Sequence, residues 1–129
     1  MSTEPTPGRT ALVITPEGGQ IAVIGAGLEA LQELVGGWIE AISAPAPAGQ
    51  SWTAYVNEEG KLLGLPGNDP ALRLLQRLGW PAPPREWIAG TMVVVGYDPD
   101  TGCALDLPEH VRRAWCALRL AAVDAAARP

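Results

Sequence analysis

Short apolar runs separated by turn-forming residues occupy the first third of the chain. Residues 11–16 and 20–24 are apolar runs divided by Glu17-Gly18-Gly19, a pattern that predicts a β-hairpin. Residues 28–35 place leucine and valine at helical spacing, and Gly36-Gly37 follows where a left-handed residue ends a helix. Residues 38–42 alternate between apolar and polar positions, which favours a strand. We therefore expect two strands, one short helix and a further strand.

The middle of the chain predicts a second hairpin. Residues 51–56 and 61–65 are strand-like and flank Asn57-Glu58-Glu59-Gly60, where Gly60 suits the positive-φ position of a bulged turn. A helix is expected next, because Asp69 is a good N-cap, Pro70 suits the first helical position and Gly79 is a stop signal. We expect its buried face to carry Leu72, Leu75 and Leu78.

The last third predicts one buried strand and one long helix. Residues 90–96 are so apolar and β-branched that we expect a central strand buried on both faces. Asp106 and Glu109 have the spacing of a capping box and open a helix. The apolar stripe expected along that helix comprises Val111, Ala114, Trp115, Leu118, Ala122 and Ala125. The predicted fold class is α+β, with the order ββαβββαβα and helices packed on a mainly antiparallel sheet.

Length and composition limit the organisation to a single domain. The chain has 129 residues, of which 47% are hydrophobic, so we expect one α+β domain over residues 11–126 and a disordered tail over residues 1–10. The tail lacks the apolar segment of a targeting signal, and no apolar run approaches the roughly 20 residues of a membrane helix. Cys103 and Cys116 are expected to be free thiols in a reducing cytoplasm.

The charge balance bears on possible partners. Fourteen acidic residues against nine basic ones give a net charge of −5, which argues against a broad surface for nucleic acid or an anionic membrane. A local basic patch is compatible with this balance.

A glycine-rich turn between a strand and a helix superficially matches a dinucleotide-binding fingerprint. Gly25, Gly27 and Ala30 have the G-x-G-x-x-A spacing that places backbone amides around a pyrophosphate. Such a site also needs a long crossover helix and a parallel second strand that ends in an acid. The helix here is short, and only Glu40 lies near the required place. We therefore interpret the segment as a flexible turn, with no cofactor.

A second motif resembles the loop of a calcium site. Asp98, Asp100, Asp106 and Glu109 fall at positions 1, 3, 9 and 12 of such a loop, but Cys103 stands where the loop needs a glycine. No helix precedes Asp98. We therefore expect a surface turn here and no metal.

The residues offer little support for catalysis. His110 is the only histidine, and it is expected in the first turn of the last helix, where the helix dipole disfavours a positive charge. The chain lacks a Gly-x-Ser-x-Gly elbow, and Glu58 and Glu59 are neighbours in a turn that point apart. We therefore assign no catalytic residues and expect a protein that is not an enzyme.

Three blocks in fixed order resemble a known family. They are LEALQELVGGWIEAI (residues 28–42), YVNEEGKLLGLP (residues 55–66) with Asn68, and IAGTMVVVG (residues 88–96). Together they resemble a family of small uncharacterised proteins, a domain of unknown function carried by phages, conjugative elements and actinobacterial genomes. The resemblance implies an accessory gene of a mobile element that modulates the host or its defences. It implies no catalytic residues, because the family has no established activity.

Two functional hypotheses follow from the residues and the resemblance. In the first, the chain is a non-enzymatic binding protein that acts in counter-defence by capturing a host protein or a small anionic, nucleotide-like signal. Donors and a stacking surface would come from Asn57, Lys61, Asn68, Trp87, Thr91, Arg112 and Arg113.

Each of those residues also has a structural interpretation. Asn57 suits a turn, Asn68 a helix cap and Thr91 a strand, while Trp87 suits the core. Lys61 and the arginines suit a solvated face.

In the second hypothesis, the chain is a homo-oligomeric regulatory or assembly module without a small ligand. The alanine-rich stripe over residues 114–126 permits close helix approach, either to a second subunit or to the sheet.

Overall fold

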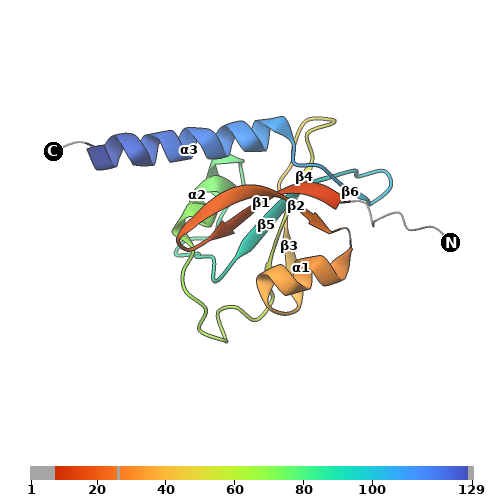
Figure 1. The fold of residues 1–129 in the computed structure, drawn as a ribbon, viewed down its shortest axis with the longest axis horizontal. Helices are drawn as coiled ribbons and strands as arrows, with labels where there is room; N and C mark the ends of the chain where they lie inside the picture. Colours follow the sequence, from red (N-terminus) through yellow and green to blue (C-terminus); the bar gives the residue numbers. More distant parts are fainter. Residues whose placement is uncertain (1–7, 26, 128–129) are drawn as a thin grey trace.

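An antiparallel sheet lies between α1 on one face and α2 and α3 on the other (Figure 1). The computed structural model describes residues 8–25 and 27–127. In chain order the elements are β1 (Gly8–Thr15), β2 (Gly18–Gly25), α1 (Leu28–Val35), β3 (Ile39–Ile42), β4 (Trp52–Asn57), α2 (Asp69–Arg77), β5 (Met92–Tyr97), β6 (Ala104–Leu105) and α3 (Glu109–Ala127). The strand order is β2-β1-β5-β4-β3, with β6 added to β5, and every pair is antiparallel. The α+β prediction is confirmed.

Strand β5 is the centre of the sheet and is buried on both faces, as its apolar sequence predicts. Met92 and Val94 point into the core beneath α2 and α3, whereas Val93 and Val95 point into the smaller core beneath α1. Because strand side chains alternate between faces, a continuous run of apolar residues fits only a strand covered on both sides.

The first hairpin and the first helix form as predicted. Thr15 pairs with Gly18, so Pro16 and Glu17 make the tight turn between β1 and β2. Strand β1 begins at Gly8, earlier than the predicted domain start, and residues 1–7 lie outside the described part of the chain. Helix α1 ends at Gly36, whose φ of 81° is the left-handed conformation expected of a terminal glycine.

The prediction of a second hairpin is wrong. Residues 58–64 form consecutive turns instead of a strand, closed by hydrogen bonds such as Leu63 N–H to the Glu59 carbonyl at 2.9 Å. Strand β4 already pairs with β3 on one side and β5 on the other, so it has no free edge for a strand over 61–65. Leu62 and Leu63 are accordingly exposed. The sheet gains its additional strand at β6.

Helix α2 begins at the predicted place with a different cap. The side chain of Asn68, and not that of Asp69, accepts a hydrogen bond from the Ala71 backbone N–H. Of the predicted face, Leu75 is buried, and Leu72 and Leu78 are partly buried against the same core. Ala71 and Leu74 are buried as well and widen that face.

Helix α3 also departs from the predicted start. The Asp106 carboxylate accepts from the Thr10 backbone N–H at 2.8 Å, while Val111 and Arg112 donate to the Pro108 carbonyl. Asp106 therefore joins β6 to β1 and does not cap the helix. Capping-box spacing identified where the helix begins, but not what the carboxylate binds.

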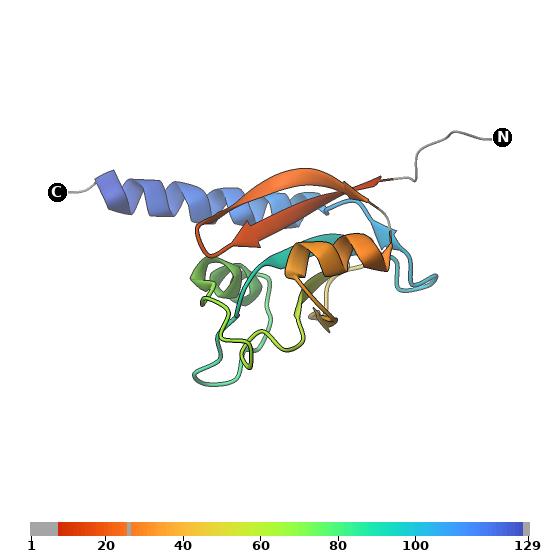
Figure 2. The same ribbon diagram turned by 60° about the horizontal axis from the view of Figure 1, so that its bottom comes forward.

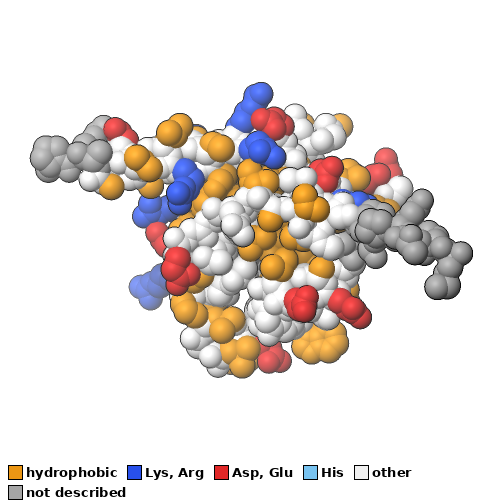
Figure 3. Space-filling model, in the orientation of Figure 1, with side chains coloured by type: hydrophobic (Ala, Val, Ile, Leu, Met, Phe, Trp, Pro, Cys, Tyr) orange, Lys and Arg blue, Asp and Glu red, His pale blue; other side chains and the backbone are white. Residues whose placement is uncertain are grey.

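The second half of α3 extends past the sheet (Figures 1 and 2). Val111 and Trp115 are buried and Leu118 is partly buried, whereas residues 119–126 are exposed. Ala122 and Ala125 therefore do not belong to a buried stripe. Figure 3 shows hydrophobic side chains on the surface of this projecting half. None of the helices in the described ranges combines the length and apolarity that a membrane span requires.

Candidate functional site

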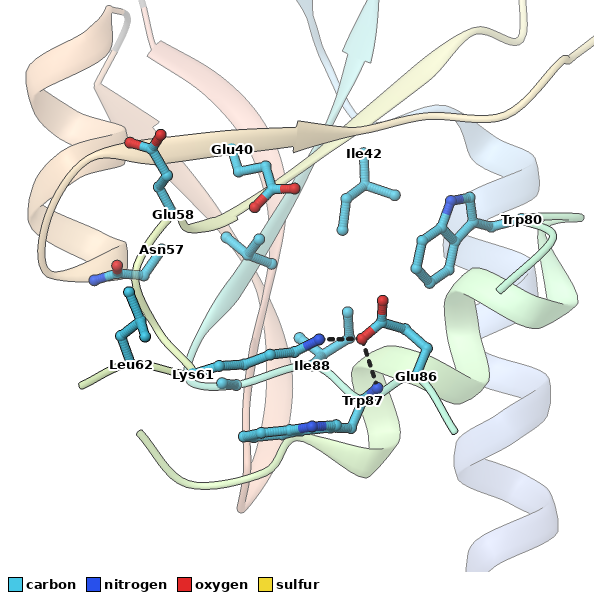
Figure 4. Close-up of a pocket in the computed structure, with 12 residues that line it drawn as sticks. Glu40, Ile42, Asn57, Glu58, Lys61, Leu62, Trp80, Glu86, Trp87 and Ile88 are labelled. Carbon is cyan, nitrogen blue, oxygen red and sulfur yellow. Dashed lines mark hydrogen bonds and ion pairs between the residues drawn. The ribbon is translucent and has the colours of Figure 1, made fainter. Parts of the chain in front are cut away.

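A pocket beside the edge strand β3 collects several of the residues predicted to bind a ligand (Figure 4). We call it the Trp87 pocket; it encloses about 160 Å³. Its lining residues are Glu40, Ile42, Val56, Asn57, Glu58, Lys61, Leu62, Trp80, Glu86, Trp87, Ile88 and Ala89. They come from β3, the end of β4, the turns after β4, and the segment between α2 and β5. At roughly 30 Å³ per water, the space suits a side-chain-sized group.

The floor of the Trp87 pocket is a small ionic and aromatic cluster. The Lys61 ammonium donates to a carboxylate oxygen of Glu86 and lies 5.4 Å from the centroid of the Trp87 ring. The Trp87 backbone N–H donates to the same oxygen at 2.9 Å. These two hydrogen bonds, the Lys61 one foremost, lower the pKa of Glu86 below its ordinary value. Lys61 is thus paired with Glu86, although its side chain remains 48% exposed.

The Trp87 pocket has an excess of acidic groups. Glu40, Glu58 and Glu86 line it, and Lys61 is the only basic residue among the lining residues. Figure 4 shows Glu40 on the wall opposite the Lys61–Glu86 pair, and Trp80 directed into the space from the far end. The balance of charge disfavours an anion here. The prediction that Lys61 contributes to an anionic-ligand site therefore lacks electrostatic support from its surroundings.

Two of the predicted ligand-binding residues serve the fold. Asn57 is 6% exposed; its Nδ2 donates to the Val35 carbonyl at the end of α1, and its Oδ1 accepts from the Glu59 N–H. Asn68 is 1% exposed, and all of its side-chain hydrogen bonds are made to backbone groups. The cap interpretation of Asn68 is confirmed. Both donors of the Asn68 amide are used by backbone carbonyls, and the Asn57 amide is held in place between α1 and the turn after β4.

The other predicted residues lie elsewhere. Thr91 is half-buried directly before β5 and lines neither the Trp87 pocket nor the groove described below. Trp87 is 42% exposed, so it belongs to the pocket surface and not to the core. Arg112 and Arg113 are on α3, which packs on the face of the sheet opposite to α1. Each of the two arginines is within ion-pair distance of Glu109.

A second depression brings basic side chains together from two helices. We call it the Arg113 groove; it has a volume of about 480 Å³ and lies between the 45–47 loop, the end of α2 and the first turns of α3. Its lining residues are Pro45, Ala46, Pro47, Trp52, Arg77, Leu78, His110, Arg113, Ala114 and Ala117. No carboxylate lines this groove. The Nδ1 atom of His110 is buried without a hydrogen-bond partner among the described residues.

Arg77 and His110, which line the groove together with Arg113, were not predicted as site residues. Arg77 is the last residue of α2 and His110 lies in the first turn of α3, more than thirty positions later, so only the packing of α2 against α3 brings them to one groove. Basic residues at the end of one helix and the start of another are weak signals by themselves.

The glycine and aspartate segments lie in a structural context that differs from that of the two motifs they resemble. Strand β2 pairs antiparallel with β1, and the eight-residue α1 is too short for a dinucleotide crossover; Ala26 between the glycines lies outside the described residues. The Asp98 carboxylate accepts from the Asp100 N–H at 2.9 Å and closes the turn between β5 and β6. Within the described ranges, no three His, Cys, Asp or Glu side chains are grouped as metal ligands.

Comparison with known proteins gives one match. Residues 9–118 match a family model described as "Domain of unknown function (DUF3846)". No curated protein and no solved structure matches the chain.

Proposed function

The chain belongs to the DUF3846 family, and we propose that it is a non-enzymatic binding protein that captures a small anionic, nucleotide-like ligand in the Arg113 groove. One observation carries the proposal: Arg77, His110 and Arg113 converge on one open groove that no carboxylate lines.

The chemistry of these side chains suits phosphate. Arginine presents a planar set of donors that matches two oxygens of a phosphate at once. His110 lies in the first turn of α3, where the helix dipole favours negative charge. Leu78 and Ala114, which are partly buried, add apolar surface on which a base can rest.

Glu109 is the one nearby competitor for Arg113. The two side chains approach to 3.6 Å, and they are 64% and 80% exposed. An exposed ion pair of this kind contributes about 0–1 kcal/mol, so a doubly charged phosphate can displace Glu109 from the guanidinium.

The biological setting is part of the proposal. The three blocks resemble proteins carried by phages, conjugative elements and actinobacterial genomes, which favours an accessory protein that acts in the host cytoplasm. Capture of a nucleotide signal, or of a host protein that carries phosphate-like anionic groups, would counter a host defence without any chemical step.

The test is a binding measurement with a charge-matched control. AMP, a cyclic dinucleotide and inorganic phosphate are titrated by calorimetry into the wild-type protein, and the ligand is then recovered and checked for hydrolysis. We expect binding without turnover, and loss of binding in Arg77→Gln/Arg113→Gln. Arg73→Gln/Arg119→Gln removes the same charge from the same two helices at a different groove and is expected to bind normally.

Two outcomes would contradict this function. Equal loss of binding in both double variants would show that net charge, not the Arg113 groove, attracts the ligand. Consumption of the ligand would show an enzyme.

A second candidate function is a homo-oligomeric regulatory or assembly module. The projecting half of α3 exposes Leu120 at 71% and Val123 at 62%, large apolar surfaces that a second subunit would cover. Sedimentation over a range of concentrations tests this function. Leu120→Glu/Val123→Glu should dissociate such an assembly, whereas Leu62→Glu, at a leucine in the turns after β4 that is 89% exposed, should leave it intact.

A further inference from the structure

We propose that the Trp87 pocket is a separate binding site for an organic cation that carries a primary ammonium group on an alkyl chain. The site and its charge preference differ from those of the Arg113 groove, so the inference does not depend on the proposed function.

The chain itself places an ammonium group in this pocket. The Lys61 Nζ lies over the Trp87 ring, 5.4 Å from its centroid, and donates to Glu86. The face of an indole ring attracts a cation through its quadrupole, and a carboxylate adds a charge-assisted hydrogen bond. Lys61 therefore shows which chemistry the floor of the pocket accommodates.

The opposite wall repeats the carboxylate and aromatic components without a cation. Glu40 lies across the pocket from Lys61, and Trp80 is directed into the same space (Figure 4). Among the residues that the structure describes, neither Glu40 nor Glu58 forms a salt bridge. A ligand ammonium in the remaining space of about 160 Å³ would thus find an acceptor and a ring.

The apolar lining defines the rest of the ligand. Ile42, Val56 and Ile88 border the same space and suit a chain of methylene groups. A bare divalent metal fits less well, because such an ion needs several oxygen ligands and no three acidic side chains in the described ranges are grouped to hold one. An alkylammonium group satisfies both the acidic and the apolar parts of the pocket.

The first experiment titrates the wild-type protein with 1,4-diaminobutane and follows the indole N–H resonances of Trp80 and Trp87 by NMR. We expect both resonances to shift on binding at millimolar concentrations, with no shift from glutarate, a dianion of similar length. A parallel titration with Nα-acetyl-lysine amide asks whether the ammonium comes from a free diamine or from a lysine side chain. Binding of either supports the site, and binding of neither overturns it.

Charge-matched variants identify the acceptors. Glu40→Gln/Glu58→Gln is expected to weaken diamine binding about tenfold, as loss of two carboxylates from one small site implies. Glu29→Gln/Glu33→Gln makes the same change in net charge on α1, which covers the other face of the sheet, and should leave binding unchanged. Equal weakening in both variants would overturn the proposal.

Lys61→Met gives the sharpest distinction. It removes the internal ammonium that occupies Glu86 and the Trp87 ring, so diamine binding is expected to strengthen about threefold to fivefold, the worth of a partly exposed ion pair. Weaker diamine binding in Lys61→Met would show that Lys61 does not compete with the ligand ammonium for Glu86 and the Trp87 ring, and would overturn the proposal. Circular dichroism establishes that each variant is folded before it is titrated.

Discussion

The side-chain amide of Asn68 donates to the backbone carbonyl of Ile14 at 2.8 Å and fastens the start of α2 to strand β1. The same amide nitrogen donates to the Gly90 carbonyl at 2.8 Å, in the segment that leads into β5. One buried side chain thus joins β1, the segment before β5 and α2, which are far apart in sequence.

Replacement of Asn68 should destabilise the whole domain. Asn68→Ala removes the donor for two buried carbonyls and the acceptor for the Ala71 N–H, so we expect the free energy of unfolding to fall by about 3 kcal/mol. Urea unfolding monitored by tryptophan fluorescence measures it. Asn68→Asp keeps the cap but not the donor; wild-type stability in that variant would show that the cap alone matters.

Replacement of Asn57 should lower the free energy of unfolding by less than replacement of Asn68, and the effect should be local to α1. Its Nδ2 donates to the Val35 carbonyl at 3.1 Å, and Asn57→Ala leaves that helix end without this donor. We expect the free energy of unfolding to fall by about 1–2 kcal/mol, and amide hydrogen exchange to accelerate more in α1 than in β5 relative to the wild type. Uniformly faster exchange throughout the sheet would contradict a local role.

Glu86 should make stability depend on pH in the acid range. Its pKa in the folded state is lowered from 4.5, chiefly by the Lys61 hydrogen bond, so its contribution is present above pH 4.5 and lost as the pH falls through the lower folded pKa. Glu86→Gln, which retains an acceptor for the Trp87 N–H, should cost about 0.5–1 kcal/mol at pH 7, since the ion pair is partly exposed. The difference from wild type should shrink as the pH falls toward 3. A difference that stays constant from pH 7 to 3 would contradict the role of the ion pair.

Gly96 should tolerate no side chain. A Cβ atom at this position would lie 2.3 Å from the Asp106 carbonyl oxygen, a backbone atom that cannot move aside cheaply. Gly96→Ala should therefore lower the free energy of unfolding by about 2–3 kcal/mol and disturb the pairing of β5 with β6. Gly67→Ala is the matched control, because its nearest contact would be an ordinary 3.9 Å. Similar losses in the two variants would exclude the close contact as the cause.

The fold was largely predictable because its central signals are local. The bounds of α1 and the burial of β5 follow from the spacing of apolar residues and from Gly36. The strand expected over 61–65 fails for a tertiary reason, since β3 and β5 occupy both edges of β4. No local pattern carries that information.

The candidate sites were less predictable, for the same physical reason. Asn57 and Asn68 carry donors that a sequence cannot distinguish from exposed ones, yet both side chains are buried and donate to backbone carbonyls. Arg77 and His110 become neighbours of Arg113 only through the packing of α2 on α3. Lys61 and Trp87, which were predicted to bind a ligand, line the same pocket, but the charge of that pocket also depends on Glu40 from β3.

The projecting half of α3 gives the molecule a natural attachment point. The family match ends at residue 118, and residues 119–126 are exposed, so this segment adds little to the packed interior. A fluorophore or surface tether placed on residues 119–126 would stand clear of the sheet and of both depressions, so it would leave the fold and ligand access to the depressions unaltered.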